Sequence, residues 1–233
     1  MFYLITDQDN KSWRDIVWGE NVSHTENNPN YHFSVFNSPQ TATYMYPYYE
    51  RTLHFPKVWE VKAENLARSE GFRSKFSKLT SLKEFKIALP TNEQRIVFGI
   101  LSCMNLITNP IFKDWALKYL KGEDQTPESA FKVNEKLLEM MSCTWMGTPE
   151  NQYFYCAHAI LTAVAINEPF VLPATAAHRA YHDSLNFNFE APTHELKPEE
   201  IKQISNMAPE ELNLEQVAQI VNIMPAAEIA SLL

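Results

Sequence analysis

The hydrophobic period of the sequence changes at about residue 90, and this change constrains the fold more than any other feature. Residues 57–63 (KVWEVKA) alternate between two distinguishable sets of side chains, whereas Ile96, Val97 and Ile100 begin a spacing of three and four residues. A period of two is typical of a strand, and a period near 3.6 is typical of a helix. We therefore predict an α+β fold, with a small mixed-sheet module in residues 1–90 packed on a mainly α-helical bundle in residues 91–185.

Other segments of the first module also fit short elements. Residues 2–6 (FYLIT) and 31–36 (YHFSVF) are strand candidates, and residues 84–89 (EFKIAL) are expected to form the last strand, closed by Pro90. Residues 39–49 predict a short helix that Pro47 ends. The charged stretch 66–82 has no clear period and stays ambiguous.

The helical module carries strong local signals for helix ends. Residues 91–94 (TNEQ) form a capping-box pattern, and Asn109-Pro110 combines a cap with a proline in the first turn. The start signal TPE occurs at residues 126 and 148, and the helix that follows the first of these carries apolar side chains that include Phe131 and Leu138. Gly122 is expected to end the second helix, and a fifth helix is expected after Pro173.

Residues 186–198 predict a linker, because they contain two prolines and no clear period. Residues 199–233 predict a tail of short helices separated by prolines. This tail resembles the short-helix repeats of the magnesium-transporter N-domain and flagellar-motor superfamily. Short stacked helices cannot bury their apolar stripes alone, so we expect the tail to pack on the chain or on a partner.

The formal net charge of −8 argues against duplex DNA and anionic membranes as partners. The one basic segment, Arg68–Lys86, is interpreted as a solvated face with extended lysine side chains. The first residues lack a signal-peptide pattern, and no apolar run is long enough to cross a bilayer. The widely spaced Cys103, Cys143 and Cys156 predict free thiols in a reducing compartment, so we expect a cytoplasmic protein, or one carried in a virion.

Three segments together resemble a phage and actinobacterial protein family with no assigned activity. The segments are residues 4–24, residues 57–63 with 81–107, and residues 110–124. The positions that match the family pattern are Ser12, Trp13, Arg14, Trp59, Glu60, Gln94, Arg95, Phe98, Trp115, Leu120, Gly122, Glu123 and Asp124. The resemblance covers roughly residues 1–165, departs by a lower alanine content after Thr126, and implies a phage-encoded protein and a fold rather than a chemistry.

A histidine pair in residues 178–184 (HRAYHDS) is the main metal candidate. His178 and His182 lie four residues apart, so both side chains could reach one ion, with His158 or Cys156 as a further ligand. The sequence lacks a glutamate between them and a second dense cluster of ligands. Histidines near a helix C-terminus are also favoured electrostatically, so we interpret the pair as structural and expect no metal.

Aromatic side chains provide candidate contact residues. Trp13, Arg14 and Trp18 are residue types that dominate protein interfaces, and the alternative is packing over a strand. A tyrosine cluster could stack on a ligand or fill a core, and its members are Tyr44, Tyr46, Tyr48 and Tyr49.

An enzymatic alternative rests on the order of elements in the first module. A strand, a serine-containing strand, a helix and a WEV strand faintly resemble NAD-dependent ADP-ribosyltransferases, which would assign catalysis to Arg14, Ser34 and Glu60. The sequence has no clear late glutamate motif for this reaction, and no Walker loop, dinucleotide fingerprint or nucleophile elbow. We therefore expect no cofactor.

The function that the sequence favours is non-enzymatic binding of another protein. Residues able to do chemistry do not cluster, whereas apolar stripes and aromatics exceed what separate short helices bury alone. The expected partner is a host or phage protein, so the chain would inhibit a host factor or take part in virion assembly. A second copy of the chain is an alternative partner.

Overall fold

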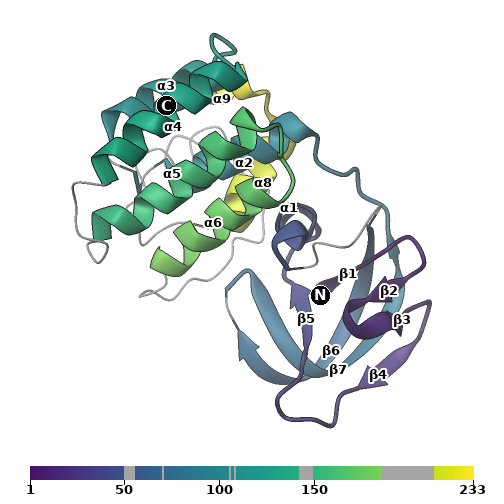
Figure 1. Cartoon of the computed structure of the whole chain (residues 1–233). Coiled ribbons are helices and arrows are strands. Elements are labelled where there is room, and N and C mark those ends of the chain that lie inside the picture. Colours follow the sequence, from purple (N-terminus) through teal and green to yellow (C-terminus); the bar gives the residue numbers. More distant parts are fainter. Residues whose placement is uncertain (50–55, 70, 105, 108, 142–148, 185–212) are drawn as a thin grey trace. The chain divides into compact units, whose positions relative to one another are not determined.

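The chain divides into two compact units, Met1–Leu89 and Pro90–Leu233. The computed structural model describes residues 1–49, 56–69, 71–104, 106–107, 109–141, 149–184 and 213–233 (Figure 1). The first unit holds an antiparallel sheet and the second is helical, so the predicted α+β class is confirmed.

The first unit is built on a five-stranded antiparallel sheet in the order β4-β7-β5-β1-β6. Because β7 also pairs with β6, the strands β1, β5, β7 and β6 close into a ring. A two-stranded sheet of β2 and β3 lies outside this ring. The elements are β1 Phe2–Thr6, β2 Lys11–Ser12, η1 Trp13–Asp15, β3 Ile16–Val17, β4 Ser23–Thr25, β5 Phe33–Phe36, α1 Pro39–Tyr49, β6 Lys57–Ser69 and β7 Arg73–Phe85.

The long hairpin of β6 and β7 corrects the prediction for the last strand. That strand was expected at residues 84–89, but β7 begins at Arg73 and ends at Phe85. Register shifts near Glu60 and between Leu66 and Arg68 break the alternation of the hairpin. Its charged side chains also form cross-strand ion pairs, such as Lys78–Glu64 at 3.1 Å, which the sequence pattern alone does not reveal.

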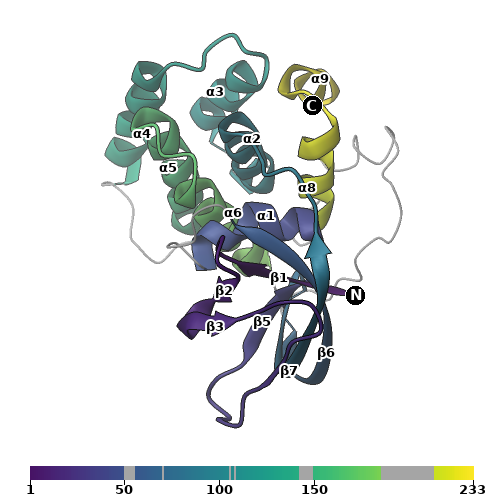
Figure 2. The same ribbon diagram turned by 90° about the vertical axis from the view of Figure 1, so that its right-hand side faces the viewer.

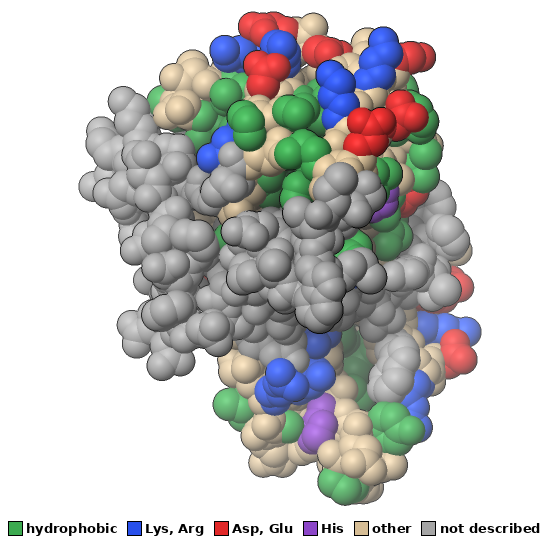
Figure 3. Space-filling view, turned by 60° about the vertical axis from the view of Figure 1, so that its left-hand side comes forward, with side chains coloured by type: hydrophobic (Ala, Val, Ile, Leu, Met, Phe, Trp, Pro, Cys, Tyr) green, Lys and Arg blue, Asp and Glu red, His purple; other side chains and the backbone are tan. Residues whose placement is uncertain are grey.

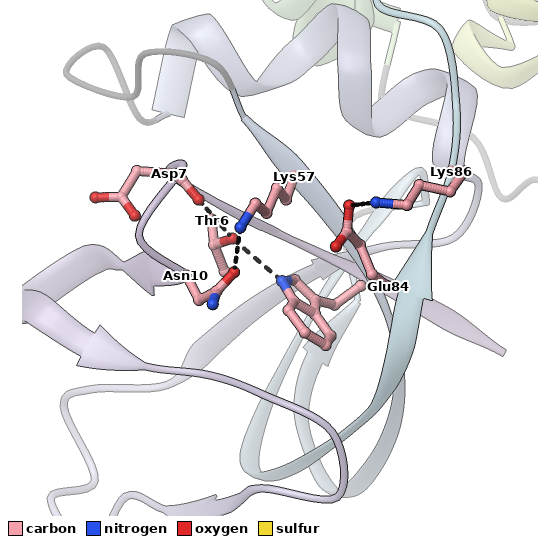
Figure 4. Close-up of polar contacts among 7 residues, drawn as sticks. Thr6, Asp7, Asn10, Lys57, Glu84 and Lys86 are labelled. Carbon is pink, nitrogen blue, oxygen red and sulfur yellow. Dashed lines mark hydrogen bonds and ion pairs between the residues drawn. The ribbon is translucent and has the colours of Figure 1, made fainter.

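The core of the sheet unit lies on one side of these strands. It consists of Leu4, Trp18, Phe33, Val35, Trp59, Val61, Phe76 and Leu79. The indole N–H of Trp59 donates to the Thr6 hydroxyl at 3.2 Å, and Lys57 Nζ donates to Asn10 Oδ1 at 2.8 Å beside it (Figure 4). The bond to Thr6 satisfies the polar end of the buried Trp59, which stabilises its place in the core.

Helix α1 contacts β1, β5 and β6. Pro47 lies inside this helix instead of ending it, which corrects the prediction. The proline falls near the C-terminal end, where it removes one backbone hydrogen bond without interrupting the turns before it.

The helical unit confirms the predicted starts of its first four helices. Thr91 and Gln94 form a complete capping box, Asn109 Oδ1 accepts from the backbone of α3, and Gly122 follows α3 with a φ of +72°. The fifth predicted helix begins at Val171 rather than after Pro173, which its first turn accommodates. The helices are α2 Asn92–Cys103, α3 Pro110–Leu120, α4 Pro127–Met141, α5 Pro149–Ala165, α6 Val171–Ser184, α8 Leu214–Ile223 and α9 Ala226–Leu232.

Helix α5 packs against α2, α4 and α6 (Figures 1 and 2). Helix α8 packs against α2, and α9 packs against α3. Val217, Ile220 and Ile229 of these last two helices are buried. The apolar stripes at the end of the predicted tail are therefore covered within the helical unit, whereas the predicted linker 186–198 and the first part of the tail lie outside the described residues.

Candidate functional site

The predicted contact residues near the start of the chain make contacts of two kinds. Trp18 is 2% exposed, and its ring meets the Phe33 ring edge-on at 5.6 Å, so it serves the core. The Arg14 guanidinium forms a 3.0 Å ion pair with Glu26 and lies 4.5 Å from the centre of the Tyr31 ring. The side chain of Trp13 lies outside the described residues.

The tyrosine cluster is buried where the structure describes it. Tyr44 and Tyr46 lie on α1 and are almost fully enclosed. They therefore fill a core, which is one of the two interpretations that the sequence allows. The side chains of Tyr48 and Tyr49 lie outside the described residues.

The three residues of the enzymatic alternative are not brought together by any described contact. Glu60 pairs with Lys83 at 3.4 Å, whereas Arg14 pairs with Glu26. Ser34 lies on β5 opposite Lys75 of β7. Ser34 alone of the three lines a cavity, although Arg14 packs on Tyr31, which lines the same cavity.

The histidines of the helical unit are placed separately. His158 Nδ1 lies 2.8 Å from Asn134 Oδ1, and desolvation by burial lowers the pKa of this imidazole. Asn134 also donates to the Thr162 hydroxyl at 3.3 Å, so the contact joins α4 to α5. His178 is half-buried on α6, and the His182 side chain lies outside the described residues. Within the part of the chain that the structure describes, no group of three or more His, Cys, Asp or Glu side chains could hold a metal ion.

A cavity of about 270 Å³ opens between β1 and β5 in the sheet unit. Its described lining combines basic, hydroxyl and apolar side chains. The lining residues are Leu4, Ile5, Ser12, Asn30, Tyr31, His32, Phe33, Ser34, Phe36, Arg73 and Lys75. Sequence reasoning named Ser34 but assigned Arg73 and Lys75 to a solvated face. Their alternation within the basic segment was the signal that could have indicated a shared face.

A second cavity, of about 370 Å³, lies between the start of α2 and the junction of α8 and α9. Gln94 crosses this region, because its side-chain amide donates to the Val221 carbonyl at 3.2 Å. This bond fastens the C-terminal helices to α2. The cavity has one charged side chain in its described lining, that of Glu93, and offers few groups for chemistry.

Several large apolar side chains of α4, of α5 and just after α5 face solvent, and one of them, Met140 of α4, is 45% exposed. Phe131 and Leu138 of α4 are 54% and 43% exposed, and Tyr155 and Ile166 at α5 are 38% and 64% exposed. The sequence placed Phe131 and Leu138 among the apolar positions of their helix, but the structure leaves them uncovered. Figure 3 shows that hydrophobic side chains lie among charged ones on the helical unit.

No family model matches the chain, and no curated protein or solved structure matches it significantly. The described helices include none with both the length and the apolar character needed to cross a membrane.

Proposed function

We propose that the chain acts without catalysis, by binding another protein through the outer surface formed by Phe131, Leu138, Tyr155 and Ile166. We call these four residues the α4–α5 surface. Their exposure is the observation that carries the proposal. Large apolar side chains that stay uncovered on a folded unit are typical of contact surfaces when they gather in one place.

Helical periodicity and two described hydrogen bonds indicate that these four side chains lie near one another. Phe131 and Leu138 are seven residues apart on α4, which places them on one face, and Tyr155 and Ile166 are eleven apart, which places them on one face of α5 and its last turn. Asn134 lies between Phe131 and Leu138 in the sequence. It forms hydrogen bonds with His158 and Thr162, which both lie between Tyr155 and Ile166 in the sequence. The pair on α4 and the pair at α5 therefore lie on either side of the line of contact between the two helices, which we call the seam.

The direction of the helices adds to this support. Residues 142–148 are the whole connection between α4 and α5, and such short connections favour antiparallel neighbours. In that arrangement Leu138 and Tyr155 fall toward one end of the seam, and Phe131 and Ile166 fall toward the other. The surface then has apolar anchors at both ends and polar groups between them.

Charge favours a different protein over a second copy. Each chain carries a formal net charge of −8, and like charges oppose self-association. The outer face of α4 also carries Lys132, Glu135 and Lys136, which would form a polar rim beside the apolar anchors. We therefore propose a partner with an apolar patch and a less negative surface.

A site-specific cross-linking experiment tests the proposal. Phe131 is replaced by photoreactive benzoylphenylalanine, the cross-linked protein is identified, and the purified pair is then titrated. Simultaneous Phe131→Ser and Leu138→Ser should weaken binding at least about 30-fold, because interface anchors contribute about 1–2 kcal/mol each. Leu66→Ser is the matched control, since Leu66 is at least as exposed as Phe131 and Leu138 but lies on β6.

Two results would count against the proposal. One is equal weakening of binding by Leu66→Ser, which would indicate a nonspecific apolar effect. The other is concentration-dependent dimerisation that the double variant abolishes, which would assign the surface to self-association. The identity of the cross-linked protein separates inhibition of a host factor from virion assembly, the two roles that the proposal allows.

A further inference from the structure

We propose that the cavity between β1 and β5 is a binding site for a small organic oxyanion, a phosphate monoester or carboxylate carried on a compact apolar group. This site is independent of the α4–α5 surface, because all of its described lining residues belong to the sheet unit. The proposal rests on how the strands diverge, on the placement of two basic side chains, and on the apolar lining.

The cavity exists because β1 and β5 pair at a single position. Tyr3 lies opposite Phe36, and the register between the two strands contains no other pair. On its other side, β1 pairs with β6 along its whole length. The gap beside β5 is lined by Leu4 and Ile5 of β1. A ligand can therefore enter between two strands without breaking a continuous ladder.

Two basic side chains are held on one face of this gap. Arg73 and Lys75 are two residues apart on β7, so their side chains point to the same face about 7 Å apart along the strand. Lys75 lies directly opposite Ser34, and Arg73 lies opposite Phe36. The neighbouring Phe33, Val35 and Phe76 belong to the core on the other face. Two cationic side chains of β7 therefore lie on the same face as the Ser34 hydroxyl and the Phe36 ring of β5.

The charge of the lining favours an anion. Arg73 is 8% exposed, so its guanidinium acts in a low-dielectric place where attraction to an oxyanion is strong. His32 adds a third basic side chain to the described lining. Arg14 stacks on Tyr31 at the cavity, but its charge is paired with Glu26 at 3.0 Å.

The apolar lining and the size define the rest of the ligand. Ile5 and Phe36, which lie on the same face as Arg73 and Lys75, supply aliphatic and aromatic contacts. The volume of about 270 Å³ lies just below the usual range for small-molecule sites, which suits a compact group such as a single ring. A bare inorganic ion would leave these apolar walls uncovered.

Nuclear magnetic resonance titration of the full ¹⁵N-labelled chain tests the site. The probes are phenyl phosphate, benzoate and neutral benzamide. We expect at least one anion to bind with a Kd on the order of 1 mM, with shifts at the Ser34 and Lys75 amides, and benzamide to bind at least about tenfold more weakly. The tighter anion identifies the headgroup as phosphate or carboxylate.

Two variants test whether binding depends on the charge of Lys75. Lys75→Gln should weaken the better anion about tenfold. Lys78→Gln is the matched control, because it removes the same charge from the same strand at a residue that pairs with Glu64 outside the described lining, and it should leave binding unchanged. The proposal is overturned if neither anion binds the wild type, if benzamide binds as tightly as the anions, or if the two variants have equal effects.

Discussion

The indole N–H of Trp18 donates a 2.7 Å hydrogen bond to the hydroxyl of Ser12, six residues earlier in the chain. This bond ties the two-stranded sheet of β2 and β3 to the core, because Ser12 ends β2 and Trp18 is buried directly after β3. Ser12→Ala should leave the buried donor without its partner and lower the free energy of unfolding by about 1–3 kcal/mol. Urea denaturation measures this change, and adding Trp18→Phe to Ser12→Ala should give less than the sum of the two single effects.

Replacing Gly99 of α2 by a residue with a side chain is predicted to destabilise the fold. A Cβ at this position would lie 3.0 Å from Pro173 Cβ and 3.2 Å from Pro173 Cα of α6. Gly99→Ala gains up to about 1 kcal/mol of helix propensity, but overpacking costs about 1–3 kcal/mol, so the net effect should be destabilising. Thermal unfolding should show a larger loss for Gly99→Val. A rise in melting temperature with either variant would contradict the close approach of α2 and α6.

The capping box at α2 should contribute measurably to stability. The Thr91 hydroxyl accepts from the Gln94 backbone N–H at 3.1 Å, and the Gln94 side chain accepts from the Thr91 backbone at 2.9 Å. Thr91→Ala should lower the free energy of unfolding by about 1 kcal/mol, whereas Thr91→Ser keeps the hydroxyl and should be nearly neutral. Denaturant titration of both variants measures the contrast. Equal losses would mean that the methyl group, rather than the cap, is responsible.

His158 should make the helical unit less stable in mild acid. Burial lowers its pKa below the ordinary value of 6.5, so the unfolded chain takes up the proton at a higher pH than the folded chain does. Stability should therefore fall as the pH drops from about 7.5 to about 5.5. The difference in unfolding free energy between these two conditions should be smaller in His158→Gln. An unchanged difference would show that other groups carry the dependence.

Cys103 and Cys156 should be protected from thiol reagents while the chain is folded. Both are free thiols with no exposed surface. In a Cys143→Ser background, which removes the cysteine outside the described residues, Ellman's reagent should react with the native protein only at the rate of unfolding. Addition of denaturant should release two reactive thiols. Fast labelling under native conditions would contradict the burial of α2 and α5.

The sequence predicted those parts of the fold that depend on local interactions. The caps at Thr91 and Asn109 and the turn at Gly122 were found because each requires only a few neighbouring residues. The strand at residues 57–63 was found because its alternation is short and regular. The extent of β7 was missed, since bulges interrupt the period and its charges pair with residues on β6.

The candidate sites show the same division. Ser34 was named from the sequence, but Arg73 and Lys75 were assigned to solvent because only the pairing of β5 with β7 brings them beside it. Phe131 and Leu138 were recognised as apolar positions, but their exposure depends on which face of α4 its neighbours cover. The spacing of apolar residues within α4 does not show which face its neighbours cover.

The amino-acid sequence by itself therefore determined the two kinds of secondary structure, where most helices begin, and the acidic character of the chain. The tertiary structure alone decided that four strands close into a ring, that β1 and β5 part beside two basic side chains, and that an apolar stripe stays uncovered. The physical reason is the separation along the chain of the residues that interact. Caps and periodicity act over a few residues of chain, whereas cavities and surfaces arise from pairing and packing between residues that are far apart in the sequence.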